Sequence, residues 1–198
     1  MGRPSEARKH ILIAAIDLLW EKSYHALTVD AVCARAEVRK GSLYHCFPSK
    51  SALVVEALQF FWATTVQPAY QKHFHRHNPP LERISNFLEW LRSLQMEKYR
   101  AAGKILGWPF FTLGCELSTN EPAINQTLRH IDALELWYFE GAIGDLVDRK
   151  MNDSDIPRIK AVSLRSSIQG VLARARVLND PKELKLLATL PQMILSSN

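Results

Sequence analysis

A short stretch, KGSLYHCFPSK at positions 40–50, predicts two helices separated by a sharp turn. Leu43 and Phe47 are four residues apart, so they share one side of a helix that begins near the start of the stretch. Pro48 ends this helix, because proline lacks the amide donor and disfavours helical backbone in the residue before it. Ser49 is then a suitable N-cap for a second helix. The apolar residues that follow continue this second helix at helical spacing.

Two more helices are expected upstream. Over residues 5–22, apolar side chains recur at i, i+3, i+4, i+7 and i+8, as in an amphipathic helix. Thr28 is an N-cap for a short helix over residues 29–36. This helix and the one at 40–47, joined by a turn at 37–39, make a helix-turn-helix that the first helix packs across.

Positive charge is concentrated near the start of the chain. The 198 residues carry a net charge of +5 with a pI of about 9.2, and residues 1–50 hold eight Lys/Arg against five Asp/Glu. The helix at 40–47 offers several donors suited to phosphates and base edges. They are Arg39, Lys40, Ser42, Tyr44 and His45. The sequence therefore favours a DNA-reading helix, with an ordinary solvated helix as the alternative.

The segments TVDAV at 28–32 and KGSLYHCFPSKSAL at 40–53 resemble the TetR/AcrR family of transcriptional regulators, over about residues 5–55. The resemblance implies an all-α fold, with a three-helix DNA-binding domain containing the helix-turn-helix at residues 1–52. Residues 53–198 would form a helical ligand-binding and dimerisation domain. The implied function is a repressor that binds a palindromic double-stranded DNA operator as a homodimer and is released by a small apolar or electrophilic effector.

The resemblance also implies which residues contact DNA. Phosphate contacts fall on Thr28, Tyr44, His45 and Lys50. The residues that approach the major groove are Arg39, Lys40, Gly41 and Ser42. Arg3 lies on a flexible N-terminal arm and would enter the minor groove, where the potential is most negative.

The turn departs from the family pattern at two positions. Glu37 stands where the family usually has glycine, and Arg39 stands where it has a Ser or Thr cap. A glutamate is strained at a positive φ, so a turn of the family's type would carry backbone strain at Glu37.

Further helices are expected downstream, and no segment alternates as a strand does. A long helix from Ser49 to His77, kinked at Pro68, connects two parts of the molecule. It ends before Asn78-Pro79-Pro80. The remaining helices are expected at 80–97, 99–106, 120–149, 154–178 and 181–195, with residues 103–114 the least regular.

Aromatic residues in this second part predict either an effector cavity or an ordinary core. The residues expected to line the cavity are Phe61, Trp62, Trp90, Trp108, Phe111, Cys115 and Trp137. Cys115 resembles, in its context, a cysteine that senses electrophiles in a subgroup of the family; the alternative is a small buried residue that fills space. By the resemblance, residues 156–195 pair with a second copy, and the alternative is a helix pair that closes the chain's own core.

Other classes of function find little support. No nucleophile elbow, Walker loop, His-Glu-x-x-His pair or Rossmann fingerprint occurs, so no catalytic residue, metal or cofactor is predicted. A thiol-dependent or other small-molecule enzyme is the alternative. His73 and His77 would share a helical face able to chelate a metal, but histidines near a helix C-terminus are also common for electrostatic reasons. The longest apolar run, residues 11–16, is too short to span a membrane, so a cytoplasmic protein is expected.

Overall fold

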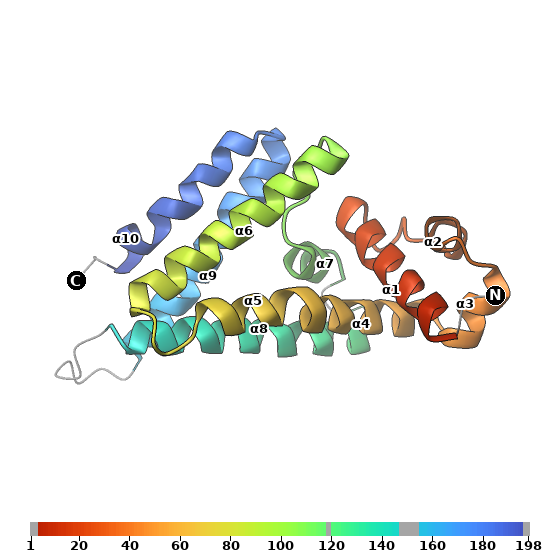
Figure 1. Cartoon of the computed structure of the whole chain (residues 1–198), viewed down its shortest axis with the longest axis horizontal. Coiled ribbons are helices and arrows are strands. Elements are labelled where there is room, and N and C mark those ends of the chain that lie inside the picture. The colour runs from red at the N-terminus through yellow and green to blue at the C-terminus, as the bar shows by residue number, and fades with distance from the viewer. Residues whose placement is uncertain (1–3, 118–119, 147–154, 196–198) are drawn as a thin grey trace. The chain divides into compact units, whose positions relative to one another are not determined.

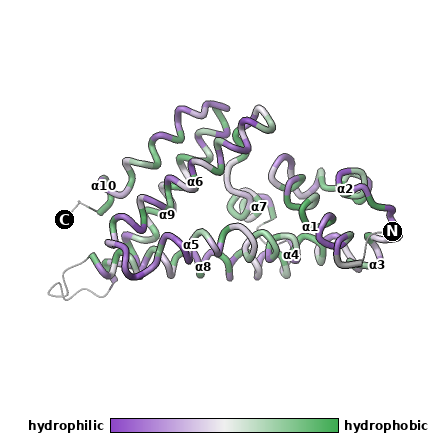
Figure 2. The backbone as a smooth tube through the Cα atoms, viewed as in Figure 1, coloured by the Kyte–Doolittle hydropathy of each residue, from purple (hydrophilic) through white to green (hydrophobic). Residues whose placement is uncertain are grey.

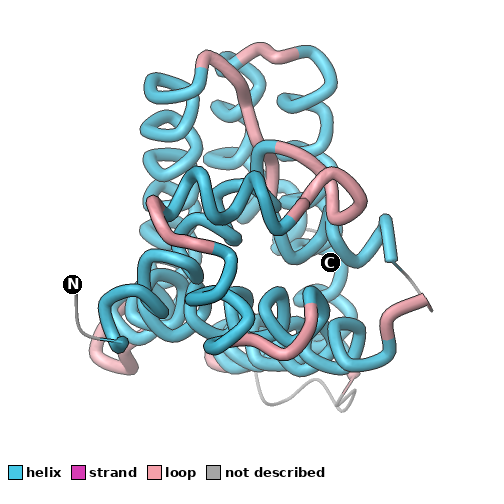
Figure 3. Tube along the Cα trace, turned by 90° about the vertical axis from the view of Figure 1, so that its right-hand side faces the viewer, coloured by secondary structure: helices cyan, strands magenta, loops and turns pink. Residues whose placement is uncertain are grey.

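The computed structural model describes residues 4–117, 120–146 and 155–195. Regular structure in this part consists of helices and contains no strand, as Figure 3 shows, which confirms the all-α prediction. The chain divides into two compact units. Unit 1 comprises Met1–Val66 with Pro109–Ile131, and unit 2 comprises Gln67–Trp108 with Asp132–Asn198. The boundary expected at residues 52 and 53 falls within a helix and stays a prediction about which part binds DNA.

Unit 1 contains the predicted helix-turn-helix (Figure 1). Its elements are α1 (Pro4–Glu21), α2 (Val29–Ala36), α3 (Lys40–Cys46), α4 (Lys50–Phe61), the π-helical turn η1 (Trp62–Val66), α7 (Pro109–Leu117) and the first part of α8 (Pro122–Gly144). Helix α1 packs against α2, α3 and α4. Trp20 and Phe61 meet edge to face at 5.2 Å between ring centroids, and Phe61 also contacts Phe110 at 5.7 Å. These aromatic rings form part of the core of unit 1.

Arg8 fastens α1 to the end of α3. Its guanidinium donates a hydrogen bond to the carbonyl oxygen of Cys46 at 3.0 Å and lies 4.6 Å from the centroid of the Phe47 ring. It also forms an ion pair with Glu56 of α4. One side chain thus joins three helices of the unit.

Unit 2 is built from α5 (Gln67–His73), α6 (Pro80–Ala102), the rest of α8, α9 (Ile156–Leu178), the 3₁₀ segment η2 (Pro181–Thr189) and α10 (Leu190–Leu195). The prediction of a separate helix at residues 99–106 was wrong. Helix α6 instead continues to Ala102 and ends at Gly103, whose φ of 66° is the left-handed cap conformation that favours glycine. The irregular stretch is correspondingly shorter than expected, because Pro109 begins helix α7.

An aromatic cluster forms the centre of unit 2. The ring of Tyr70 stacks on Phe87 at 4.2 Å and on Tyr138 at 4.7 Å between centroids. Phe74 and Phe139 meet at 5.3 Å. In Figure 2, hydrophobic and hydrophilic residues alternate along the helices, as expected for helices that bury one face.

The loop after α5 separates His73 from His77. Helix α5 ends at His73, so His73 and His77 do not share a helical face. Buried Arg83 holds this loop through hydrogen bonds to the carbonyl oxygens of Asn78 at 2.7 Å and Arg76 at 2.8 Å. The described residues contain no group of three or more His, Cys, Asp or Glu side chains placed to hold a metal ion. None of the described helices is both long and apolar enough to cross a membrane.

Candidate nucleic-acid interface

The turn between α2 and α3 places Glu37 in the left-handed backbone conformation. Thr28 caps α2, since its hydroxyl oxygen accepts a hydrogen bond from the Ala31 amide at 3.2 Å. Glu37 has φ 56° and ψ 40°, and its amide donates to the carbonyl of Cys33. The amide of Val38 donates to the same carbonyl at 3.0 Å. The turn therefore forms with a glutamate in the left-handed region.

Replacing Glu37 with glycine is expected to stabilise the fold. A residue with a Cβ costs about 1 kcal/mol in the left-handed conformation, and glycine removes that strain. Thermal unfolding should show a higher midpoint for Glu37→Gly, whereas Glu37→Ala keeps the Cβ and serves as the matched control. Equal midpoints for the two variants would contradict this explanation.

Helix α3 presents the predicted DNA-contacting residues on one exposed face. Leu43 and Phe47 are buried at 3% and 0% exposure and fix the helix against the rest of unit 1. The exposed residues, named here the α3 face, are Arg39, Lys40, Gly41, Ser42, Tyr44 and His45. Tyr44 is 59% exposed although it is aromatic. Arg3, the remaining predicted groove contact, lies outside the described residues.

Lys40 is engaged in an ion pair on this face. Its Nζ lies 2.6 Å from Oδ1 of Asp30 in α2, and both side chains are exposed. The hydrogen bond with Asp30 raises the pKa of Lys40, so the ammonium group stays charged. A phosphate or base that binds Lys40 must therefore compete with the Asp30 carboxylate.

Lys50, the first residue of α4, packs on the ring of Tyr24. Its Nζ lies 4.2 Å from the ring centroid, in a cation–π contact. Partial burial lowers the pKa of Lys50, and the nearby carboxylates of Glu116 and Glu121 oppose this shift. The ammonium group predicted to bind phosphate is thus positioned by an aromatic ring.

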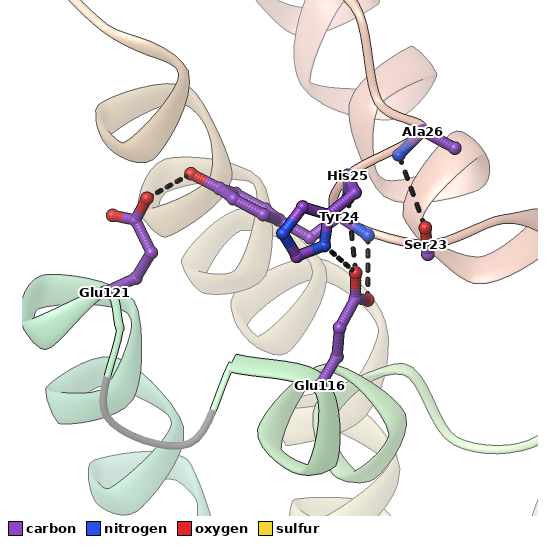
Figure 4. A network of polar contacts seen from close by, with 6 residues as sticks. All are labelled: Ser23, Tyr24, His25, Ala26, Glu116 and Glu121. Carbon is purple, nitrogen blue, oxygen red and sulfur yellow. Dashed lines mark hydrogen bonds and ion pairs between the residues drawn. The ribbon is translucent and has the colours of Figure 1, made fainter.

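Figure 4 shows how two carboxylates hold the loop that carries Tyr24. Glu116, in α7, accepts hydrogen bonds from the amides of Tyr24 at 2.8 Å and His25 at 3.2 Å, and contacts Nδ1 of His25 at 2.7 Å. The Tyr24 hydroxyl donates to Oε1 of Glu121 at 2.7 Å. Burial, together with Glu121, raises the pKa of Tyr24, so this hydroxyl remains a donor. Burial alone would raise the pKa of Glu116, but these hydrogen bonds lower it.

The residues predicted to line an effector cavity have different surroundings. Phe61 and Trp62 are buried in unit 1, and Trp108 is buried in unit 2, while Trp90 is half-buried and contacts Phe87 at 5.2 Å. The other three are exposed: Phe111 at 41%, Trp137 at 65%, and Cys115. Cys115 is therefore not the buried filler that one interpretation expected. The cavity assignment stays a prediction.

Unit 2 buries a charged cluster around Glu135, which is 1% exposed. Oε2 of Glu135 lies 2.6 Å from a guanidinium nitrogen of Arg165, and Oε1 accepts a hydrogen bond from the Trp108 indole at 3.3 Å. Arg165 also pairs with Asp132 at 2.5 Å. Burial raises the pKa of Glu135 to about 7, even though Arg165 favours the charged form. A cavity of about 10 Å³ beside this cluster has room for one water molecule.

The raised pKa of Glu135 predicts a dependence of stability on pH. The carboxyl titrates near 4.5 in an unfolded chain and near 7 in the fold, so the folded state binds the extra proton between these values. Its contribution is fully present below pH 4.5 and is lost as the pH rises to 7, by about 3 kcal/mol. Urea unfolding at pH 5 and pH 8 should show this loss in the wild type and not in Glu135→Gln. A pH profile shared by both proteins would contradict the assignment.

Comparison with known proteins assigns the segment that contains the helix-turn-helix to a protein family. Residues 11–57 match the family described as "Bacterial regulatory proteins, tetR family". Over 58 residues the chain is 41% identical to the "Uncharacterized HTH-type transcriptional regulator YdeS" of Bacillus subtilis (strain 168), a match that covers 28% of this chain and 29% of that relative. The "HTH-type transcriptional repressor DhaR" of Mycobacterium sp. (strain GP1) is 25% identical over 173 residues, which cover 86% of this chain and 82% of the relative.

Solved structures share the fold over the whole chain. A TetR-family transcriptional regulator from Agrobacterium tumefaciens has a TM-score of 0.83 at 15% identity, with 97% of this chain and 99% of that chain covered. The similarity of fold thus extends through both units, while the family model matches residues 11–57.

Proposed function

The chain belongs to the tetR family of bacterial regulatory proteins, and we propose that it is a cytoplasmic repressor that binds a palindromic DNA operator as a homodimer. The observation that carries this proposal is the α3 face. It presents hydrogen-bond donors and cations on a helix whose opposite side is anchored in the core. A rigid helix with this surface can enter a major groove and contact base edges and phosphates.

Gly41 supports the close approach of DNA to this face. A Cβ added at position 41 would meet no atom of the described residues within 4 Å, so packing inside the chain does not require glycine there. Glycine inside a helix costs about 1 kcal/mol relative to alanine. The glycine at position 41 is explained if this surface must lie close against another molecule.

We propose that the dimer forms through α8 and α9. The ion pairs Arg165–Asp132 and Arg158–Glu140 set these two helices antiparallel within unit 2. In this register Trp137 of α8 lies level with Ile159 and Val162 of α9. The three apolar side chains are 65%, 60% and 44% exposed. Such an exposed apolar face on paired helices is typical of a surface that a second copy covers.

Two further observations support this choice of helices. Gly141 and Gly170 lie inside α8 and α9, and a Cβ at either would meet no atom of the described part of the chain within 4 Å, so a second copy could approach closely. Residues 181–195, by contrast, pack on α6 and α9 of their own chain and bury Leu184, Leu187 and Leu190. That part of the expected dimer segment closes the chain's own core, while α9 remains available.

Replacing Trp137 with glutamate is expected to break the dimer without unfolding the chain. A large aromatic side chain in the centre of an interface contributes about 2 kcal/mol or more, which corresponds to a thirtyfold or greater rise in the dimer dissociation constant. Sedimentation equilibrium measures this constant directly. Leu186→Glu, at a 44% exposed position outside the proposed surface, is the control. A dimer equally stable in both variants would contradict the assignment.

Selection from a random duplex library tests the proposed function. The protein should enrich a short palindrome with half-sites about 34 Å apart, the spacing of one turn of DNA, because a two-fold dimer presents two α3 faces. Recovery of duplexes without a common sequence would overturn the proposal. Release of the operator by a small effector is the accompanying proposal.

A further inference from the structure

Arg39 stands where a capping residue would stabilise helix α3. Thr28, in the same place before α2, caps that helix by accepting a hydrogen bond from the Ala31 amide at 3.2 Å. Ser49 caps α4 in the same way, through the Ala52 amide at 3.0 Å. Arg39 makes no such bond, because a guanidinium carries donors only and cannot accept from a helix amide. Helix α3 therefore lacks the side-chain cap that α2 and α4 both have.

The side chain of Arg39 is also uncommitted. It is exposed, and within the part of the chain that the structure describes its guanidinium has no hydrogen bond, ion pair or ring contact. The Arg39 carbonyl accepts the amide of Ser42 at 2.9 Å, so the backbone that carries the side chain is fixed. Lys40, the neighbouring cation of the α3 face, is paired with Asp30 at 2.6 Å. Of these two cations, Arg39 is the one that can bind a ligand without breaking an existing contact.

A base edge explains this arginine better than a phosphate does. Serine and threonine hydroxyls can both cap a helix and bind a phosphate, so a phosphate contact at this place would not require loss of the cap. A guanidinium instead offers two parallel N–H donors, which match the N7 and O6 acceptors of guanine in the major groove. Gly41 leaves room for the DNA beside it, since a Cβ there would meet no described atom within 4 Å.

We propose that Arg39 is a specificity-determining residue, whose guanidinium binds N7 and O6 of one guanine in each half-site of the operator. The inference rests on the proposed function and adds to it one base and the residue that selects this base. Because the two α3 faces of a two-fold dimer are equivalent, the guanine recurs at the matching position of both half-sites. The missing cap is then the cost of the base contact.

Anisotropy titrations with the selected operator, changed at single positions of one half-site, test the assignment. For the wild type, replacing the G·C pair by A·T should weaken binding about fivefold or more. Replacing the guanine by 7-deazaguanine, which keeps the base pair but lacks N7, should weaken it about threefold or more. In Arg39→Ala both changes should matter less than twofold. Arg76→Gln, which removes an exposed arginine of unit 2, is the control and should keep the wild-type preference.

Uniform weakening of all duplexes by Arg39→Ala would indicate a phosphate contact and overturn the assignment. Arg39→Gln adds a test by gain of preference, because a glutamine amide pairs with N6 and N7 of adenine. Selection with this variant should return the same palindrome with A·T in place of the G·C pair. A variant that still selects guanine at that position would also overturn the assignment.

Arg39→Thr separates base reading from a role in helix structure. Threonine restores the cap, so the thermal midpoint should rise above that of the wild type while the guanine preference falls below twofold. A lower midpoint would show that Arg39 itself supports the helix, and would overturn the argument from the missing cap. If the wild type selects no common sequence, the proposed function fails. If it selects a palindrome whose guanine preference survives Arg39→Ala, the Arg39 assignment alone fails.

Discussion

Lys40→Ala is expected to weaken binding to the selected operator strongly and to relax its sequence preference. A side chain that reads a base edge contributes a roughly 5- to 150-fold preference, and a dimer loses this contact at both half-sites. The loss also leaves Asp30, its partner at 2.6 Å, facing the DNA without a cation. Anisotropy titrations with the operator and with single-base variants measure affinity and preference together.

Two further variants distinguish a base contact of Lys40 from a phosphate contact. Lys50→Ala should weaken all duplexes alike and leave the preference unchanged, because phosphate contacts position the protein and base contacts specify the sequence. Asp30→Asn should tighten binding, because it releases Lys40 from its competing carboxylate. If Lys40→Ala behaved as Lys50→Ala does, α3 would lie differently on the DNA from the arrangement proposed.

Arg165→Met is expected to destabilise the fold by about 3 to 5 kcal/mol. Glu135 is 1% exposed and has Arg165 as its ion-pair partner at 2.6 Å. Without the guanidinium, the buried carboxyl must remain charged in an apolar environment or take up a proton. Urea unfolding at pH 8 measures the loss most clearly, because Glu135 is mostly ionised there in the wild type.

A second substitution separates the lost ion pair from lost packing. Arg165→Met/Glu135→Leu removes both charges and should recover most of the stability. Arg158→Met breaks the exposed contact with Glu140 and should change stability by less than about 1 kcal/mol. A double variant as unstable as Arg165→Met would show that the ion pair is not the source of the effect.

The helix-turn-helix could be predicted because its signals are local. Thr28 and Ser49 cap their helices through contacts three residues away, and Leu43 and Phe47 bury one side of a short helix. The exposed α3 face followed from the same spacing. Strain at Glu37 was also foreseeable, although only the structure shows that the turn accepts it.

The features that could not be predicted from the sequence depend on contacts between residues far apart in the chain. Tyr24 and Glu116 are 92 positions apart, and no local pattern pairs an aromatic residue with a carboxylate at that separation. The Glu135–Arg165 pair is hidden for the same reason. The error at residues 99–106 is of another kind: Gly103 ends α6 by its positive φ, while Pro109, taken as a breaker, begins α7.

Binding of the selected operator and a scrambled duplex over a range of salt concentrations tests the central claim most directly. The protein should bind the operator with a strong preference. Its affinity should fall linearly with salt on logarithmic axes, since each neutralised phosphate releases about 0.9 counterion. Lys50→Ala should reduce this slope by about two in a dimer. Equal affinity for both duplexes, or an affinity that does not change with salt, would contradict the proposal that the α3 face binds DNA.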